Sequence, residues 1–193
     1  GEQVVATGFA GGHTGALIEQ LAAADGIMTD FTHVNAESRT CINIFDKATG
    51  IHTEFLEGGA EIPKDKQEEL IRNYKTLIQS ADAVAISGSV PKGVGTSIYK
   101  RMTEIATDFH KPVLLDTSGQ TLCECVKAAP TLIKPNQDEI VQLTGQQIKD
   151  EASLIEAGQK LQASGIKYVV ISLGKDGSLL ISEKGVWKGA VPK

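Results

Sequence analysis

Short apolar runs alternate with helical apolar stripes along most of this chain. The runs are rich in Val, Ile and Leu with little polar alternation, which is typical of strands in a parallel sheet covered on both faces. Between them, apolar residues recur every three or four positions, which predicts amphipathic helices. The expected strands are 4–6, 83–86, 112–115, 131–133 and 168–171. Strands that alternate with helices indicate βαβ units and a doubly wound α/β sheet.

The helical stripes have recognisable ends. Pro63 precedes the first stripe, and proline favours the first turn of a helix. Gly145 and Gly165 follow the third and fourth stripes, where glycine commonly ends a helix. The stripes lie at 70–78, 98–109, 137–144 and 154–161.

Two segments break this rhythm. Residues 39–45 and 51–56 alternate with a period near two across a loop that contains Gly50, which predicts an antiparallel hairpin outside the parallel sheet. The tail, 178–182 and 186–191, predicts a second hairpin. The sequence has no internal repeat and no obvious linker. We therefore expect one α/β domain over residues 1–193 with a small β appendage at about 37–57.

Composition narrows the class of partner. Acidic residues outnumber basic ones 24 to 19, for a net charge of −5, which disfavours binding to nucleic acid or a membrane surface by bulk charge. The sequence lacks an apolar run near the ~18 residues of a membrane span, and Gly1-Glu2-Gln3 does not resemble a signal peptide. We interpret the three cysteines (41, 123 and 125) as structural or incidental. The four histidines (13, 33, 52 and 110) do not have the spacing of metal ligands. We expect a cytoplasmic protein.

The candidate chemistry gathers after the strands. In open α/β sheets, ligands bind beyond the carboxyl ends of the strands. Four successive strand ends here carry small, hydroxyl or charged residues, in the segments 87–93, 116–119, 134–139 and 172–177. This succession predicts a binding cleft.

The residue types in the cleft favour an anion. Lys134 stands beside a helix that begins near Asn136, and a fixed cation next to exposed backbone N–H groups suits a phosphate. Asn136 equally suits the role of an N-cap. Glu139 either completes a capping box or faces the cleft and holds Mg²⁺ through water. Gly174 and Gly177 permit close approach of the backbone to a ligand, or serve a plain strand connection.

A dinucleotide site is the weaker alternative. The segment from Gly8 to Gly15 follows the first strand and precedes a helix, with Asp30 as a possible ribose-binding acid. It lacks the G-x-G-x-x-G spacing and the lysine of a P-loop. A nucleotide-dependent oxidoreductase therefore stays only as an alternative.

Four motifs together resemble the PfkB/ribokinase family of sugar kinases, and most of all its hexose-phosphate branch (1-phosphofructokinase and tagatose-6-phosphate kinase). In the family's order, they are 37–43, 87–91, 134–139 and 172–177. The resemblance implies a ribokinase-like three-layer α/β/α sandwich with a mostly parallel central sheet and a small β-sheet lid. It also implies ATP-dependent phosphorylation, with Mg²⁺, of fructose 1-phosphate or tagatose 6-phosphate to the bisphosphate.

The resemblance implies a role for each residue that matches a family motif. Arg39 matches a lid arginine that binds the substrate phosphate. Asn43 matches the phosphofructokinase form of that motif and Cys41 matches the tagatose form, so the resemblance does not decide which sugar is the substrate. Ser87 and Gly88 line the substrate side. The nucleotide contacts implied are Lys134, Asn136, Ser172, Leu173, Gly174, Lys175, Asp176 and Gly177, and the metal contacts are Glu139 (through water) and Asp116.

The hairpin suggests a homodimer, because Ile42, Ile44, Ile51 and Phe55 need a partner surface. The alternative is a monomer in which the hairpin folds back over its own cleft.

Two parts of the family pattern do not occur in this sequence. The substrate-binding aspartate with its Gly-Gly-Lys-Gly-x-Asn segment would precede Gly1, and the Gly-Ala-Gly-Asp motif with the catalytic base would follow Lys193. We therefore expect an interior portion of a kinase, with no catalytic base of its own and inactive alone. The alternative is a non-catalytic module that binds a nucleotide or a sugar phosphate.

Overall fold

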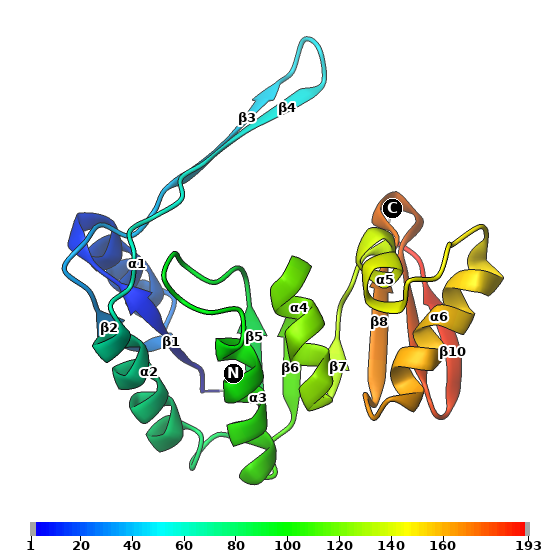
Figure 1. The fold of residues 1–193 in the computed structure, drawn as a ribbon. Coiled ribbons are helices and arrows are strands. Elements are labelled where there is room, and N and C mark those ends of the chain that lie inside the picture. Colours follow the sequence, from blue (N-terminus) through cyan, green and yellow to red (C-terminus); the bar gives the residue numbers. More distant parts are fainter. Residues whose placement is uncertain (1–2, 192–193) are drawn as a thin grey trace. The chain divides into compact units, whose positions relative to one another are not determined.

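The computed structural model describes residues 3–191, so the expectations about Gly1, Glu2 and Lys193 lie outside the described residues. The chain divides into two compact units (Figure 1). The smaller unit runs to Thr76 and includes Pro91–Val94, and the larger comprises Leu77–Val90 and the residues from Gly95 onward.

The larger unit is built on a six-stranded sheet in the order β10-β9-β8-β7-β6-β5. The strands are β5 (Val84–Ser87), β6 (Val113–Asp116), β7 (Leu132–Ile133), β8 (Tyr168–Ser172), β9 (Ser178–Ser182) and β10 (Gly185–Gly189). Neighbours among β5 to β8 are parallel, whereas β9 and β10 are antiparallel to the strand before them. The predicted strands 83–86, 112–115, 131–133 and 168–171 and the predicted tail hairpin are confirmed. The hairpin also extends the main sheet, because β9 pairs with β8.

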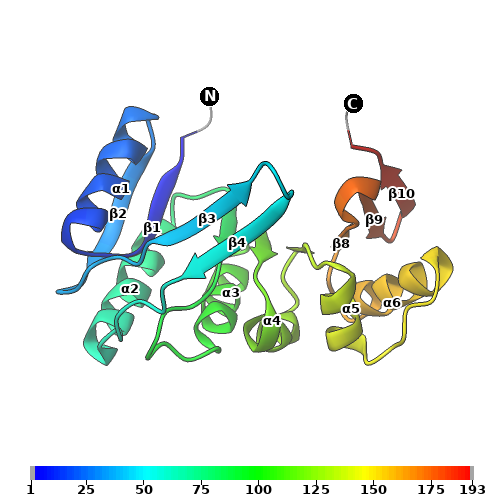
Figure 2. The same ribbon diagram turned by 90° about the horizontal axis from the view of Figure 1, so that it is seen from above.

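Helices cover one face of this sheet (Figure 2). They are α3 (Ile98–Asp108), α4 (Gly119–Cys125), α5 (Gln137–Thr144) and α6 (Glu151–Ala163), with short 3₁₀ turns η1 (Val126–Ala128) and η2 (Gly174–Asp176). The parallel strands join the sheet in chain order, and right-handed crossovers then place every helix on the same side. Burial follows this arrangement: Val113 and Leu115 are buried, whereas Leu114 between them is 41% exposed. The apolar runs predict a sheet that is covered on both faces. The described residues of this unit cover only one face of the sheet.

The helix ends agree with the sequence. Gly145 ends α5 in the left-handed conformation, at φ +67°. Asp150 caps α6 in a capping box with Ser153. Where α6 lies on the sheet, a Cβ added at Gly158 would come within 2.2 Å of the Ile181 side chain, so this glycine allows the close packing.

The smaller unit begins with a parallel pair, β1 (Val5–Ala10) and β2 (Met28–His33), joined through α1 (Gly12–Ala24). The strand predicted at 4–6 begins at Val5 and extends to Ala10, and β2 was not predicted. Helix α2 (Lys64–Leu77) follows Pro63 and buries Leu70, Ile71 and Tyr74, which confirms the predicted stripe.

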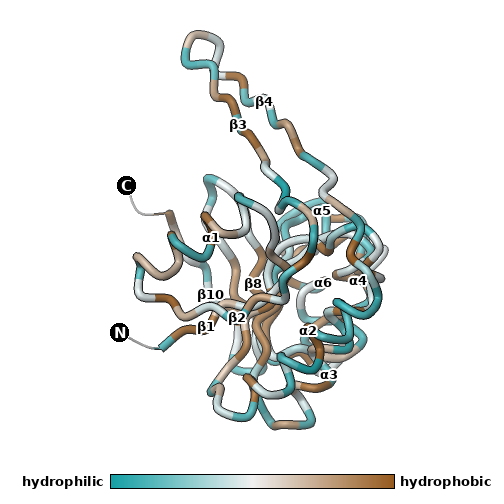
Figure 3. Tube along the Cα trace, turned by 90° about the vertical axis from the view of Figure 1, so that its left-hand side faces the viewer, coloured by the Kyte–Doolittle hydropathy of each residue, from teal (hydrophilic) through white to brown (hydrophobic). Residues whose placement is uncertain are grey.

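The predicted antiparallel hairpin is confirmed as β3 (Cys41–Asp46) and β4 (Ile51–Leu56). It extends away from the rest of its unit, and apolar and polar residues alternate along it (Figure 3). The pairing register puts Ile42, Ile44, Ile51 and Phe55 on one face, and each is more than half exposed. The other face carries Asn43, which is paired with Glu54.

No helix in the described part of the chain combines the length and the apolar character that a membrane crossing requires. The three cysteines are free thiols, of which Cys125 is buried. Burial raises the pKa of the Cys125 thiol to about 12.

Candidate functional site

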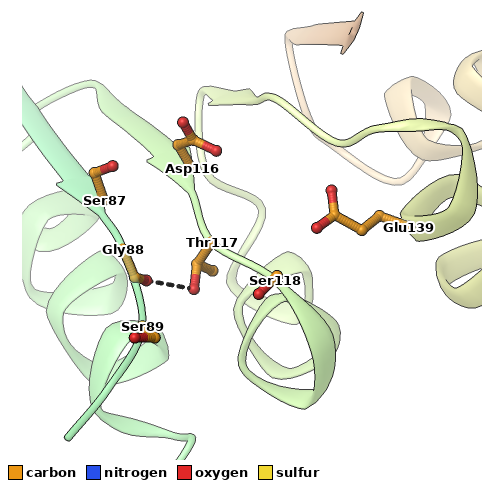
Figure 4. Close-up of a pocket in the computed structure, with 7 residues that line it drawn as sticks. All are labelled: Ser87, Gly88, Ser89, Asp116, Thr117, Ser118 and Glu139. Atoms are coloured by element: carbon orange, nitrogen blue, oxygen red, sulfur yellow. Dashed lines mark hydrogen bonds between the residues drawn. The ribbon is translucent and has the colours of Figure 1, made fainter. Parts of the chain in front are cut away.

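The larger unit has an open pocket of about 270 Å³ at the carboxyl ends of β5 and β6 (Figure 4). It is lined by Ser87, Gly88, Ser89, Asp116, Thr117, Ser118 and Glu139. The structure therefore brings together four residues singled out in the sequence, from three separate strand ends: Ser87, Gly88, Asp116 and Glu139.

Hydrogen bonds hold the two strand ends together. The Gly88 N–H donates to the Asp116 carbonyl at 3.0 Å, and the Thr117 hydroxyl donates to the Gly88 carbonyl at 2.7 Å. Gly88 has φ +89°, a conformation that glycine adopts without strain. On the β5 side, the Tyr99 hydroxyl donates to the Ser87 carbonyl at 3.4 Å. The backbone floor of the pocket is thus fixed, whereas the side chains of Ser87 and Asp116 are directed outward, away from these bonds (Figure 4).

Lys134 supplies the cation beside this pocket. Its Nζ lies 3.3 Å from Asp116 Oδ1, and the two side chains are 45% and 49% exposed. Solvent weakens an ion pair of this kind, so it contributes little to folding. An incoming anion can consequently compete with Asp116 for the ammonium group at small cost.

At the start of α5, the capping role expected of Asn136 and Glu139 is confirmed. The Glu139 N–H donates to Asn136 Oδ1 at 2.9 Å, and the Asn136 N–H donates to Glu139 Oε2 at 2.8 Å. This is a complete capping box. Glu139 also lines the pocket, so its carboxylate both caps α5 and faces the cleft.

The glycine-bearing loop after β8 adjoins the same helix start. Asn136 and Ser172 form a parallel bridge, and the Ser172 N–H donates to the Pro135 carbonyl at 3.0 Å. The loop closes on itself, because the Leu173 N–H donates to the Gly177 carbonyl at 2.8 Å. Gly177 is required here: it has φ +92°, and an added Cβ would lie 1.9 Å from the Gly189 carbonyl oxygen. The remaining residues of the expected contact, Gly174, Lys175 and Asp176, form η2, and the loop is not among the residues that line the pocket.

The two hairpin residues belong to the smaller unit, whereas the pocket lies wholly in the larger one. Asn43 Nδ2 donates to Glu54 Oε1 at 2.9 Å, and Asn43 Oδ1 lies 3.2 Å from His52 Nδ1. Its amide is therefore engaged across the hairpin. Arg39 stands at the base of the hairpin, between Ser38 and Thr40.

The carboxylates of the pocket suit one kind of metal site. The described residues contain no cluster of three or more His, Cys, Asp or Glu side chains that could hold an ion. Asp116 and Glu139 nevertheless face one pocket. Mg²⁺ commonly binds through one or two carboxylates and keeps waters and substrate phosphates as its other ligands. The donor set therefore fits Mg²⁺ that arrives with a phosphate ligand.

Three lining residues were not assigned from the sequence. Ser89, Thr117 and Ser118 add hydroxyl groups to the pocket. The sequence signal for these three residues was their position, since each lies one or two residues beyond the end of β5 or β6. Hydroxyl residues are also ordinary in turns, so position alone did not distinguish them.

Comparison with known proteins gives a consistent result over the whole chain. A family model described as "pfkB family carbohydrate kinase" matches residues 1–192. The solved structure of phosphofructokinase-2 from Escherichia coli in complex with fructose-6-phosphate is similar, with a TM-score of 0.89 and 25% identity over 100% of this chain and 64% of that chain. A possible 1-phosphofructokinase from Thermotoga maritima has a TM-score of 0.84 and 25% identity over 96% of this chain and 59% of that one. A putative phosphofructokinase from Staphylococcus aureus has a TM-score of 0.80 and 25% identity over 99% of this chain and 61% of that one. The chain thus spans less than two thirds of the length of these proteins.

Proposed function

Because this chain belongs to the pfkB family of carbohydrate kinases and has a ribokinase-like α/β fold, we propose that the natural protein containing it transfers a phosphoryl group from ATP to a hydroxyl group of a ketohexose phosphate. The observation that supports this most is the pocket at the ends of β5 and β6, where a lysine, two carboxylates and several hydroxyls gather. Fructose 1-phosphate and tagatose 6-phosphate are the proposed acceptors. Fructose 6-phosphate joins them, because the Escherichia coli relative was solved with it.

On the nucleotide side, Lys134 pairs with a phosphate of ATP in exchange for Asp116. The loop Ser172–Gly177 contacts the nucleotide next to Asn136, to which the bridge at Ser172 joins it. Asp116 and Glu139 hold Mg²⁺ through water, and the ion would neutralise charge on the phosphates. The capping box keeps Glu139 oriented for this, because one of its carboxylate oxygens is bound to the backbone.

On the sugar side, Ser87 and Gly88 contact the acceptor, and Arg39 holds its phosphate. An arginine suits this task because its planar guanidinium can donate two parallel hydrogen bonds to one phosphate. Asn43 contributes from the other face of the hairpin, where Glu54 and His52 already orient its amide. The carboxylate that accepts the proton of the sugar hydroxyl lies outside this sequence in our proposal.

The hairpin also mediates a homodimer. Four of its large apolar residues, Ile42, Ile44, Ile51 and Phe55, share one face and are each more than half exposed, and burying them would remove apolar surface from water. A second copy presents the same face, so a two-fold interface is self-complementary. One structure of the Escherichia coli relative is described as a tetrameric inhibited form, an example of oligomerisation in a similar protein.

The decisive experiment measures sugar-dependent ADP release by the natural protein, with fructose 1-phosphate, tagatose 6-phosphate and fructose 6-phosphate in parallel. Unphosphorylated fructose is the matched control, and we expect turnover with at least one phosphate ester and little with fructose. Calorimetric binding of ATP and a sugar phosphate without turnover would favour the non-catalytic module instead. Oxidation of a sugar with reduction of a nicotinamide cofactor would favour the oxidoreductase alternative, which family membership makes the weaker one.

A further inference from the structure

Helix α1 receives its N-terminal cap from a distant residue. Its N-cap, Gly11, has no side chain that could accept a hydrogen bond from the first turn. The Glu37 carboxylate takes this place: the His13 N–H donates to Oε1 at 2.9 Å, and the Thr14 N–H donates to Oε2 at 3.1 Å. His13 Nδ1 lies 3.2 Å from Oε1 as well. A residue 24 positions further along the chain therefore satisfies backbone donors that helix geometry leaves without partners.

The next residue makes the attachment rigid. The Gly11 N–H donates to Ser38 Oγ at 3.1 Å, and the Ser38 N–H donates to the Gly11 carbonyl at 2.9 Å. The two glycines are needed for the close approach. A Cβ added at Gly12 would lie 2.2 Å from the Glu37 carboxylate carbon, and one at Gly11 would lie 2.2 Å from the Ala36 carbonyl oxygen. We call these residues, Gly11–Thr14 with Glu37 and Ser38, the α1 clamp.

The α1 clamp lies directly before the base of the hairpin. Arg39 is the next residue, and the Thr40 N–H donates to Glu57 Oε2 at 2.8 Å, which joins the two stems of the hairpin. The chain on either side of Arg39 is therefore held, by α1 before it and by the opposite stem after it.

We propose that Glu37 is a positioning residue for substrate binding: through the α1 clamp it fixes the base of the β3–β4 hairpin and so places Arg39 for the phosphate of the sugar. This inference rests on the proposed function, in which Arg39 holds that phosphate. It also gives a role to the glycine-rich segment after β1, which the kinase motifs did not explain.

Glu37 stays ionised near neutral pH, in the form that accepts these hydrogen bonds. The hydrogen bonds from the His13 and Thr14 backbone lower the pKa of the Glu37 carboxyl to about 2. Glu37 also stands at the positive end of the α1 dipole, where an anion is favoured. Because its side chain is 55% exposed, the carboxylate acts through directed hydrogen bonds rather than through burial.

A simpler interpretation is that Glu37 only stabilises α1. Asp150 provides the matched control, because it caps α6, a helix of 13 residues like α1, and lies in the other unit. In the natural protein, Glu37→Ala and Asp150→Ala should both lower the unfolding temperature. Only Glu37→Ala should raise KM for the sugar phosphate, about three- to tenfold, because Arg39 is present but held less closely to its productive place. KM for ATP should not change in either variant, and Glu37→Gln, which keeps one acceptor oxygen, should fall between Glu37→Ala and the wild type.

Hydrogen exchange measured by mass spectrometry separates this inference from the proposed function. Glu37→Ala should accelerate exchange in the first turn of α1 and in residues 38–41, and Asp150→Ala should not. Unchanged exchange at 38–41, or an unchanged KM for the sugar phosphate despite faster exchange, would overturn the inference. If the wild type phosphorylates no ketohexose phosphate, the proposed function fails, and the exchange data still decide whether Glu37 holds the hairpin base.

Discussion

Replacing Lys134 by methionine tests the nucleotide side of the site most directly. The substitution removes one charge and keeps an unbranched apolar chain of similar length. Lys134 is paired only at the surface, with Nζ at 3.3 Å from Asp116 Oδ1 and both side chains about half exposed. Binding and folding should therefore respond very differently.

The cost to folding can be bounded from this geometry. Two unit charges at 3.3 Å attract by about 1 kcal/mol when the medium resembles water, and measured exposed pairs contribute about 0.2–1 kcal/mol. For a chain of this size, 1 kcal/mol shifts the unfolding temperature by about 2–4 °C. We therefore expect Lys134→Met to lower it by no more than about 4 °C.

The cost to catalysis should be much larger. A hydrogen bond between an ammonium group and a phosphate contributes about 1.5–3 kcal/mol, which corresponds to roughly 10- to 150-fold in kcat/KM for ATP. The kinetic assay varies ATP at saturating sugar phosphate and then the reverse, with the natural protein. KM for the sugar phosphate should stay within twofold of the wild type.

Lys160→Met is the matched control. Lys160 Nζ lies 3.1 Å from Glu156 Oε1, the two side chains are 57% and 60% exposed, and the pair lies on α6 away from the pocket lining. It should show a similar small change in unfolding temperature and no change in either KM. Lys134 does not bind ATP as proposed if Lys134→Met keeps kcat/KM for ATP within twofold, or if this variant lowers the unfolding temperature by far more than the control does.

Four further outcomes are expected. Arg39→Ala should raise KM for the sugar phosphate by about 10- to 100-fold, since it removes charge-assisted bonds of about 1.5–3 kcal/mol each; an equal rise in KM for ATP would contradict its place on the sugar side. Ile44→Asp on the apolar hairpin face should convert a dimer to a monomer in sedimentation velocity at micromolar concentration, whereas Lys47→Asp in the turn should not; a wild type that is already monomeric would exclude the interface. The Glu37 carboxyl has its pKa lowered from 4.5 to about 2, so its stabilising contribution is present above pH 4.5 and is lost as the pH falls towards 2. Thermal unfolding of Glu37→Gln should accordingly depend less steeply on pH in that window, and an unchanged slope would argue against the clamp. The 193-residue chain alone should release no ADP in response to sugar phosphate, and turnover within tenfold of the natural protein would place catalysis within it.

The strands of the larger unit could be predicted because their apolar content is continuous, but two elements of the chain gave no such signal. β2 reads Met-Thr-Asp-Phe-Thr-His, and its one buried residue is Thr32, so hydropathy does not mark it as a strand. Helix α4 has 7 residues, which is too short for a recurring apolar stripe.

The candidate site also combines residues that could be predicted from the sequence with contacts that could not. Ser87, Gly88, Asp116 and Glu139 could be expected together, because parallel topology brings the carboxyl ends of strands to one edge of the sheet. The choice between cap and ligand at Asn136 could not be made, since one residue type serves both. The Glu37 contact with α1 joins residues 23 and 24 positions apart through backbone donors, and no spacing rule reveals such a pair.

The order of strands in the larger unit bears on how the protein is made. Each strand from β6 to β10 pairs with the strand that precedes it in the chain, so its partner has always been synthesised already. A nascent chain that leaves the ribosome can therefore extend the sheet one strand at a time, and no inner strand has to wait, unpaired, for a partner encoded later. At each stage two edges of the growing sheet are open to mispairing. One is the newest strand, and the other is the side of β5 that does not pair with β6. Pauses in translation should thus be tolerated after any complete βα unit of this region and harmful within one.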